Sequence, residues 1–130
     1  MNEDIGSTEA TLIEAGHKSI SGQELGHRLL GNTILGDFAF QFKYLMTISK
    51  DGALEGINDV GSHHLGQMAI DNGTNTISVQ WNDGWVNTTS RAYEADGKIK
   101  LYNIENGQWS TTFTKVLDGT DYPMVPPDRS

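Results

Sequence analysis

Residues 72–107 read NGTNTISVQWNDGWVNTTSRAYEADGKIKLYNIENG, and this stretch decides the fold. An Asn-Gly or Asp-Gly pair begins at positions 72, 83, 96 and 106, and two further pairs begin at Asp51 and Asp118. Asn, Asp and Gly tolerate the positive φ angles of tight hairpin turns, and the intervals between the pairs are about one strand long. The pattern predicts an antiparallel meander of sequential strands.

Turn lengths set which residues lie opposite one another, so they can be used to follow the buried face from strand to strand. Two-residue turns at Asn72, Asp83 and Asp96, and three-residue turns at Lys50 and Glu105, keep apolar residues together on one face. The predicted pairs are Met68 with Ile77, Gly66 with Val79, Trp81 with Val86, Val79 with Thr88, Ile77 with Ser90, Ala92 with Leu101, Ile48 with Leu54, Tyr44 with Asn58, Asn103 with Trp109, and Ile99 with Phe113. This register predicts that Trp81 and Trp109 face the core and that Trp85 faces solvent.

The most regular alternation lies in residues 38–48, where the even positions are aromatic or apolar and most odd positions are polar or small. Period two is typical of a strand with one buried face. We expect this stretch to be the longest strand of the meander.

A helix is expected over about residues 21–30. Residues 21–24, Ser-Gly-Gln-Glu, form a capping box, and Gly31-Asn32 supplies a left-handed stop. A helix of this length does not persist alone in water, so its apolar stripe must dock on the sheet. That stripe consists of Leu25, Leu29 and Leu30.

Three segments follow from these elements. Residues 1–19 form an N-terminal segment in which residues 8–15 have a helical pattern ended by Gly16. Residues 20–121 form one barrel domain with its leading helix. Residues 122–130 form an extended tail, because its three prolines remove backbone hydrogen-bond donors.

A meander with one apolar face and no second layer of helices must cover that face. Closure into a barrel covers it and removes the exposed sheet edges. We therefore expect a mainly β protein, an up-and-down β-barrel of seven to eight strands with a short N-terminal α-helix. A sandwich made from two halves of the meander is the alternative.

Composition restricts the partners. The 130 residues carry a formal charge of −8 with scattered Lys and Arg, which argues against nucleic acid and anionic membranes as partners. The chain has no run of about 20 apolar residues that could cross a membrane, and its acidic start does not resemble a signal peptide. We expect a soluble protein that is either cytoplasmic or exported after removal of a signal.

Several short motifs carry a family resemblance. They are residues 21–25 (SGQEL), residues 30–33 (LGNT), the aromatic strand ending at 50–52 (KDG), the strand of Trp81, residues 93–99 (YEADGKI) and residues 113–116 (FTKV). Together they resemble small bacterial proteins described as lipocalin-like or calycin-like domains of unknown function. The resemblance covers roughly residues 19–122 and implies a small β-barrel.

Catalytic and metal-binding patterns are weak. His63 and His64 are neighbours on a predicted strand and point to opposite faces, so they do not chelate one ion. Glu24 is explained by helix capping, no Gly-x-Ser-x-Gly motif is present, and the adjacency of Ser62 and His63 has no geometric meaning for a nucleophilic triad. We expect no metal, no cofactor and no enzymatic activity.

The predicted register places several polar side chains on the inward face. Buried polar groups need hydrogen-bond partners, so these residues either satisfy one another or orient a small, partly apolar ligand inside the barrel. The inward aromatic residues Phe40, Phe42, Trp81 and Trp109 would supply the apolar lining, and Gly56 and Gly66 would leave room. The candidate ligand-binding residues are Tyr44, Asn58, His64, Trp81, Ser90 and Asn103.

An alternative function uses the outside of a solid barrel. Trp85, Arg91 and Tyr93 are predicted to share the outward face of one strand. Trp, Tyr and Arg are enriched at protein interfaces, so this cluster could bind a second copy of the chain or another protein, unless the N-terminal segment covers it.

Overall fold

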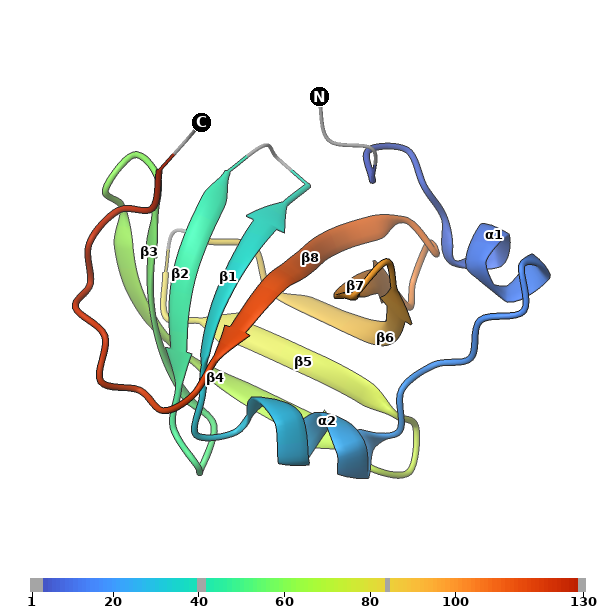
Figure 1. The fold of residues 1–130 in the computed structure, drawn as a ribbon, viewed down its shortest axis with the longest axis horizontal. Coiled ribbons are helices and arrows are strands. Elements are labelled where there is room, and N and C mark those ends of the chain that lie inside the picture. The colour runs from blue at the N-terminus through green and yellow to red at the C-terminus, as the bar shows by residue number, and fades with distance from the viewer. Residues whose placement is uncertain (1–3, 40–41, 84, 129–130) are drawn as a thin grey trace.

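The computed structural model describes residues 4–39, 42–83 and 85–128. Its elements are α1 (Glu9–Glu14), α2 (Gly22–Leu29), β1 (Thr33–Phe38), β2 (Lys43–Ile48), β3 (Ala53–Asn58), β4 (His63–Asp71), β5 (Thr76–Trp81), β6 (Thr88–Ala95), β7 (Lys98–Asn103) and β8 (Trp109–Leu117). The strands pair antiparallel in sequence order, and β1 also pairs with β8, which closes an eight-stranded barrel (Figure 1). The predicted mainly β, up-and-down barrel is confirmed, and the open sandwich is excluded.

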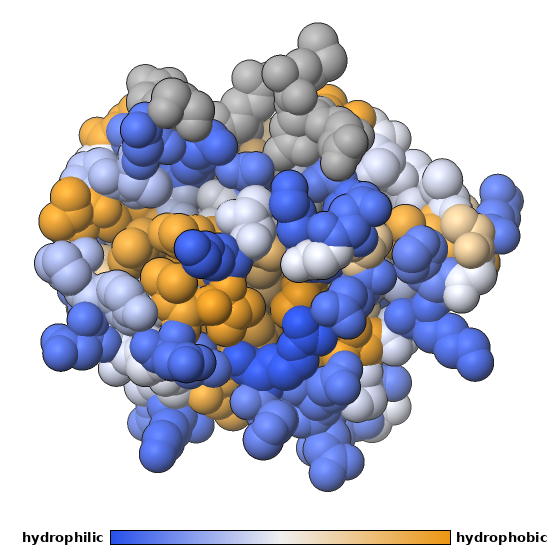
Figure 2. Space-filling model, in the orientation of Figure 1, coloured by the Kyte–Doolittle hydropathy of each residue, from blue (hydrophilic) through white to orange (hydrophobic). Residues whose placement is uncertain are grey.

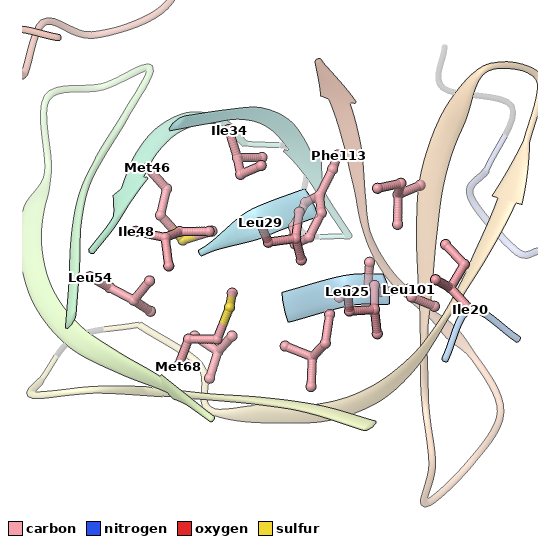
Figure 3. Close-up of a cluster of buried hydrophobic side chains, with 14 of the residues drawn as sticks. Ile20, Leu25, Leu29, Ile34, Met46, Ile48, Leu54, Met68, Leu101 and Phe113 are labelled. Atoms are coloured by element: carbon pink, nitrogen blue, oxygen red, sulfur yellow. The ribbon is translucent and has the colours of Figure 1, made fainter. Parts of the chain in front are cut away.

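Helix α2 closes one end of this barrel. The Glu24 N–H donates to Ser21 Oγ at 3.2 Å, and Gly31, just beyond the helix, has a φ of 85°, as the capping pattern predicts. Leu25 and Leu29 are fully buried and point into the barrel among side chains from the surrounding strands (Figure 3). The helix therefore acts as a plug rather than as a layer docked on the outside of a sheet.

The apolar core fills the end of the barrel next to α2. It combines the helix side chains with inward residues of every strand (Figure 3). Its buried members are Ile20, Leu25, Leu29, Ile34, Tyr44, Met46, Ile48, Leu54, Met68, Ile77, Val79, Ala92, Ile99, Leu101 and Phe113.

The expected long strand over residues 38–48 is wrong. The chain turns back after β1, and the Phe38 N–H donates to the Phe42 carbonyl at 2.7 Å, so residues 33–48 supply two strands. Asp37 lies opposite Lys43, and both are odd positions, so the alternation of inward and outward positions is the same in the two strands. Period two alone could not reveal such a turn. Phe40 lies outside the described residues.

Most of the predicted register is confirmed. Asp96 and Gly97 have φ angles of 58° and 76°, as a two-residue hairpin turn requires, and Ala92 lies opposite Leu101. The three-residue turn after Ser49 likewise pairs Ile48 with Leu54 and Tyr44 with Asn58, and the pairs Val79–Thr88 and Ile77–Ser90 form as expected.

The two-residue turn at Asn72-Gly73 is wrong. The Asp71 carboxylate accepts hydrogen bonds from the N–H groups of Gly73 and Thr74, at 2.7 and 3.2 Å, and Asn75 takes the left-handed conformation. The loop therefore contains residues 72–75, and the register shifts by two residues. Met68 pairs with Val79 rather than Ile77, and Gly66 pairs with Trp81 rather than Val79.

The turn at Asn106-Gly107 also differs from its prediction. Gly107 has the expected positive φ of 70°, and the pairs Leu101–Thr111 and Ile99–Phe113 form. A β-bulge between these pairs and the turn then places Trp109 opposite Tyr102. The extra residue turns Trp109 away from the barrel interior, because one residue of slip reverses the faces of a strand.

Trp109 joins an aromatic cluster on the outside of the barrel. Its partners there are Tyr93 and Tyr102, with Leu12 of the N-terminal segment packed against them. The structure forms helix α1 in that segment, where the sequence shows a helical pattern. We call residues 4–15, which cover the aromatic cluster, the N-terminal strap.

The C-terminal tail leaves β8 near α2 and runs without helix or strand back along the side of the barrel (Figure 1). In the register of β1, β2 and β3, Leu35, Leu45 and Ile57 lie side by side on the outer face. Figure 2 shows apolar residues gathered on this side of the molecule and framed by hydrophilic ones. Tyr122 and Met124 in the tail are half-buried.

Candidate functional site

A cavity of about 390 Å³ occupies the barrel at the end opposite α2. It is bordered by the ends of the strands and by the loops that join β1 to β2, β3 to β4, and β5 to β6. Its lining residues are Phe38, Phe42, Tyr44, Met46, Asn58, Val60, Ser62, Val79, Trp81, Trp85, Val86, Thr88, Leu101, Thr111 and Phe113. The barrel interior is therefore filled by side chains next to α2 and contains a cavity at the opposite end.

Indole rings fill the space beside two glycines that face the barrel interior. A Cβ added at Gly66 would meet the Trp81 ring at 2.8 Å, and one added at Gly56 would meet the rings of Trp81 and Trp85 at 3.0 Å each. The expectation that these glycines leave room for a ligand is wrong. They make room for the tryptophans that form one wall of the cavity.

Trp85 does not face solvent as predicted. The β5–β6 ladder ends at the pair Val79–Thr88, and Asn87 Oδ1 accepts a hydrogen bond from the Trp81 N–H at 2.7 Å. Beyond this point Trp85 and Val86 line the cavity, and the Trp85 ring packs edge-on against Trp81 with centroids 4.6 Å apart. The strand register does not predict the direction of Trp85, because this residue lies outside the β5–β6 ladder.

Tyr44 forms a fixed polar point in the opposite wall. Thr111 Oγ1 donates to the Asp37 carbonyl at 2.8 Å, so Tyr44 Oη must donate to Thr111 Oγ1, which lies 2.6 Å away. Burial raises the pKa of the Tyr44 phenol well above its usual value. Tyr44 is therefore a neutral hydroxyl whose proton is already engaged.

Asn58 stands beside the loop that joins β3 to β4. Its Oδ1 accepts hydrogen bonds from the N–H groups of Val60 and Ser62, at 3.1 and 2.9 Å. These two donors fix the orientation of the amide, and its NH₂ group is the part left to donate toward the cavity that Asn58 lines.

His64 lies at the rim between Ser62 and Asp83. Its Nε2 is 2.8 Å from Ser62 Oγ, and its Nδ1 is 3.1 Å from Asp83 Oδ1. The imidazole packs against Trp85 with ring centroids 4.7 Å apart. The neighbouring His63 points to the outside of the barrel, where its Nε2 lies 2.8 Å from Glu55 Oε2.

Three of the six candidate pocket residues line the cavity, namely Tyr44, Asn58 and Trp81, and His64 lies at its rim. Ser90 is fully buried below it, and its Oγ has no hydrogen-bond partner among the described residues. Asn103 borders a separate recess of about 200 Å³ beside the β5–β6 ladder.

Sequence reasoning missed several lining residues. The predicted register gives Trp85 an outward position, and Ser62 is not among the predicted pocket residues. Ser62 and His64 are two residues apart, so the alternation of a strand places both on one face, and this signal was available in the sequence. The contact between Asp83 and His64 continues the β4–β5 ladder, in which Trp81 lies opposite Gly66 and the Asn82 N–H donates to the Leu65 carbonyl, so the wrong turn length at Asn72-Gly73 concealed it.

Arg91 and Tyr93, predicted as a partner-binding surface, hold the N-terminal strap instead. Arg91 Nε and Nη2 donate to the Glu9 carboxylate at 2.5 and 3.0 Å, and Tyr93 Oη donates to it at 2.5 Å. The hydrogen bond from Arg91 holds the pKa of the Glu9 carboxyl below its usual value. Burial, aided by Glu9, raises the pKa of Tyr93 to about 12.

A second carboxylate fixes the start of the strap. Asp4 Oδ1 lies 2.8 Å from Lys100 Nζ, and its Oδ2 accepts from Thr112 Oγ1 at 2.6 Å. Both ion-pair side chains are nearly inaccessible to solvent. Trp109 Nε1 in turn donates to Thr112 Oγ1 at 2.9 Å. These contacts cover the aromatic cluster with the chain's own N-terminal segment.

Comparisons of this chain with protein-family models, with curated proteins and with solved structures find no match. Among residues 4–39, 42–83 and 85–128, no group of three or more His, Cys, Asp or Glu side chains is arranged to hold a metal ion. Within the same ranges, neither helix is long and apolar enough to cross a membrane.

Proposed function

We propose that the protein binds a small, partly apolar molecule in the hollow half of the barrel. The observation that carries this proposal is the cavity of about 390 Å³ inside a closed barrel that α2 plugs at one end. Cavities of roughly 300 to 1,000 Å³ with apolar walls and a few polar groups are usual for small-molecule sites.

The distribution of polar groups indicates how such a ligand would lie. The apolar walls from Phe38, Met46 and Phe113 suit an aliphatic or aromatic body directed toward the core. The Asn58 amide and the Ser62 hydroxyl stand near the loops, where they suit a hydrogen-bonding head group. An amphipathic molecule with one polar end therefore fits better than a wholly apolar or wholly polar one.

The resemblance to small bacterial lipocalin-like or calycin-like domains supports the same proposal. The closed eight-stranded antiparallel barrel has the calycin-like architecture that the resemblance implies. A barrel of eight strands is wide enough to hold one small ligand. We propose a bacterial ligand-binding barrel of this kind.

Fluorescence of the neutral dye N-phenylnaphthylamine tests the proposal. We expect a saturable rise in dye emission with the wild-type protein, and its reversal by competing medium-chain amphiphiles. Native mass spectrometry of the purified protein would identify any ligand carried through purification. Absence of saturable dye binding by a folded protein would contradict the proposal.

Two adjacent residues of β6 provide matched variants. Thr88 lines the cavity, whereas Thr89 does not and bonds to Ser78 across the sheet at 3.0 Å. Thr88→Phe places a ring in the cavity and should weaken dye binding at least about tenfold, a loss of about 1.4 kcal/mol. Thr89→Phe adds the same ring elsewhere and should leave binding within about twofold, or 0.4 kcal/mol. Equal losses in both variants would place the dye outside the cavity.

A further inference from the structure

Ser62, His64 and Asp83 form one continuous chain of hydrogen bonds at the rim of the cavity. Ser62 Oγ lies 2.8 Å from His64 Nε2, and His64 Nδ1 lies 3.1 Å from Asp83 Oδ1. Both distances are within hydrogen-bond range, and the two ring nitrogens have different partners. Ser62 also lines the cavity, so its hydroxyl adjoins the space available to a ligand.

With Asp83 ionised and His64 neutral, the donors and acceptors fix the proton positions in this chain. An ionised Asp83 carboxylate can only accept, so His64 must carry a hydrogen on Nδ1 to bond with it. In the neutral imidazole, Nε2 is then an acceptor, and the hydrogen of Ser62 Oγ must point toward it. This arrangement lets His64 remove the hydroxyl proton as Ser62 attacks an electrophile, as in a Ser-His-Asp triad.

The position of the pair follows from strand geometry. Ser62 immediately precedes β4 and His64 is its second residue, so their side chains share one face. The Trp85 ring packs on the imidazole and limits its rotation. His63, between them, bonds to Glu55 on the outside of the barrel and takes no part.

Asn58 supplies the group that an acyl transfer also needs. Its Oδ1 is held by the Ser62 N–H at 2.9 Å, which keeps the amide next to the nucleophile. The NH₂ group is available for the oxygen that becomes negatively charged when a carbonyl is attacked. One such side-chain donor contributes about 10²–10³-fold to the rate in serine hydrolases.

We infer that the rim is a hydrolytic site for carboxylic esters whose apolar part enters the cavity, an inference that rests on the proposed ligand binding. Ser62 Oγ attacks the ester carbonyl carbon while its proton passes to His64 Nε2. The carbon–oxygen bond to the alcohol then breaks, and His64 returns the proton to the leaving oxygen. Water, deprotonated by His64, attacks the acyl-Ser62 ester, which releases the carboxylic acid and restores the hydroxyl.

Asp83 acts through His64 and is a positioning residue. Its side chain is 86% exposed, so water competes for the carboxylate more than in a buried triad. We therefore expect Asp83→Asn to lower kcat for p-nitrophenyl butyrate only about tenfold, well short of the 10⁴-fold loss known for a buried triad aspartate. KM and the thermal midpoint should stay unchanged, whereas a purely structural role would shift the midpoint.

The main test combines covalent labelling with ester hydrolysis in matched variants. A fluorophosphonate probe should add once to the wild-type protein, with loss of fluoride, and peptide mass spectrometry should place the adduct on Ser62. Ser62→Ala should remove the label. Ser62→Ala and His64→Asn should each lower p-nitrophenyl butyrate hydrolysis at least about 100-fold, the lower range for a general base. His63→Asn, the same change on the other face, should retain both signals.

Dye binding separates failure of this inference from failure of the proposed function. His63→Asn, which changes a side chain on the outside of the barrel, should bind N-phenylnaphthylamine as the wild-type protein does. Saturable dye binding by the wild-type protein, with neither labelling nor hydrolysis above the Ser62→Ala level, would overturn the hydrolytic site and leave ligand binding standing. A folded wild-type protein that binds no dye would overturn the proposed function itself.

Discussion

The rim of the cavity and the outer cluster beneath the N-terminal strap contain similar side chains, but these side chains have different roles. Both combine aromatic rings with carboxylates and hydrogen-bond donors. At the rim, the His64 chain ends on Asp83, which is 86% exposed, and beside it lies open cavity. Beneath the strap, Arg91 and Tyr93 converge on Glu9, which is almost inaccessible, and none of these three residues lines the barrel cavity.

This difference separates a structural polar network from a candidate site. In the strap cluster, the Glu9 carboxylate bonds to both Arg91 and Tyr93, so the network is closed on itself and holds two parts of the chain together. At the rim, the Asn58 NH₂ group and the Ser62 oxygen retain capacity toward empty space. Unused hydrogen-bonding capacity beside a cavity is therefore what makes the rim a candidate site, whereas similar residue types alone do not.

The largest effect is expected from breaking the strap. Glu9→Ala leaves Arg91 and Tyr93 without their shared acceptor, and hydrogen bonds to charged groups contribute about 1.5–3 kcal/mol. Arg91 is 37% exposed and can recover part of this from water, so we expect a loss of about 2 kcal/mol in the free energy of unfolding. Urea denaturation followed by far-ultraviolet circular dichroism measures it.

Glu14 provides the matched control in the same helix. Its side chain is exposed, so Glu14→Ala should change the free energy of unfolding by less than about 0.5 kcal/mol. Dye binding should be unaffected in both variants, because the strap lies outside the cavity. A loss of binding in Glu9→Ala at full folding would show that the two regions are coupled.

Acid should produce a smaller loss of the stability that the strap contributes. Arg91 lowers the pKa of Glu9 in the folded state below the reference value of 4.5, so the stabilisation is complete above that pH and is lost as pH falls through the folded pKa. The difference in unfolding free energy between wild type and Glu9→Gln should therefore be constant from pH 7 to 5 and shrink below about pH 4.5. A difference that stayed constant down to pH 2.5 would show that the carboxylate charge contributes nothing.

At the rim, truncation should affect binding more than stability. Trp85 is half-buried, lies outside the strand ladders and contacts the rings of Trp81 and His64. We expect Trp85→Ala to weaken dye binding about tenfold and to lower the free energy of unfolding by no more than about 1 kcal/mol. Dye titration and urea denaturation of the same preparation give both values. A larger loss in the free energy of unfolding than in the free energy of dye binding would make Trp85 a core residue rather than part of the cavity wall.

Much of the barrel could be predicted from the sequence because turn chemistry is local. Asp96-Gly97 and the turn at Lys50 fixed their hairpins, and the capping residues fixed α2. Errors arose where a side chain overrode the simplest turn, as Asp71 does at residues 72–75. The reversal of the chain after Phe38 left no trace in the alternation, because Asp37 and the residue opposite it, Lys43, are both odd positions.

The tryptophans show where local reasoning fails. The bulge near Trp109 moved it to the outer cluster, and the end of the β5–β6 ladder allowed Trp85 to fold inward. Both changes lie near strand ends, where the regular ladder no longer sets the positions of side chains. The candidate site was therefore only partly predictable, with Tyr44, Asn58 and Trp81 in the cavity wall and Trp85 on the wrong side.

The sequence by itself determined a meander with one apolar face, the helix that begins after Ser21 and most of the strand register, since each depends on contacts between residues near in the chain. Only the tertiary structure decided that α2 plugs the barrel and that a cavity remains at the end opposite α2. The physical reason is that these features join residues from different hairpins, whose distances are fixed only when β1 pairs with β8.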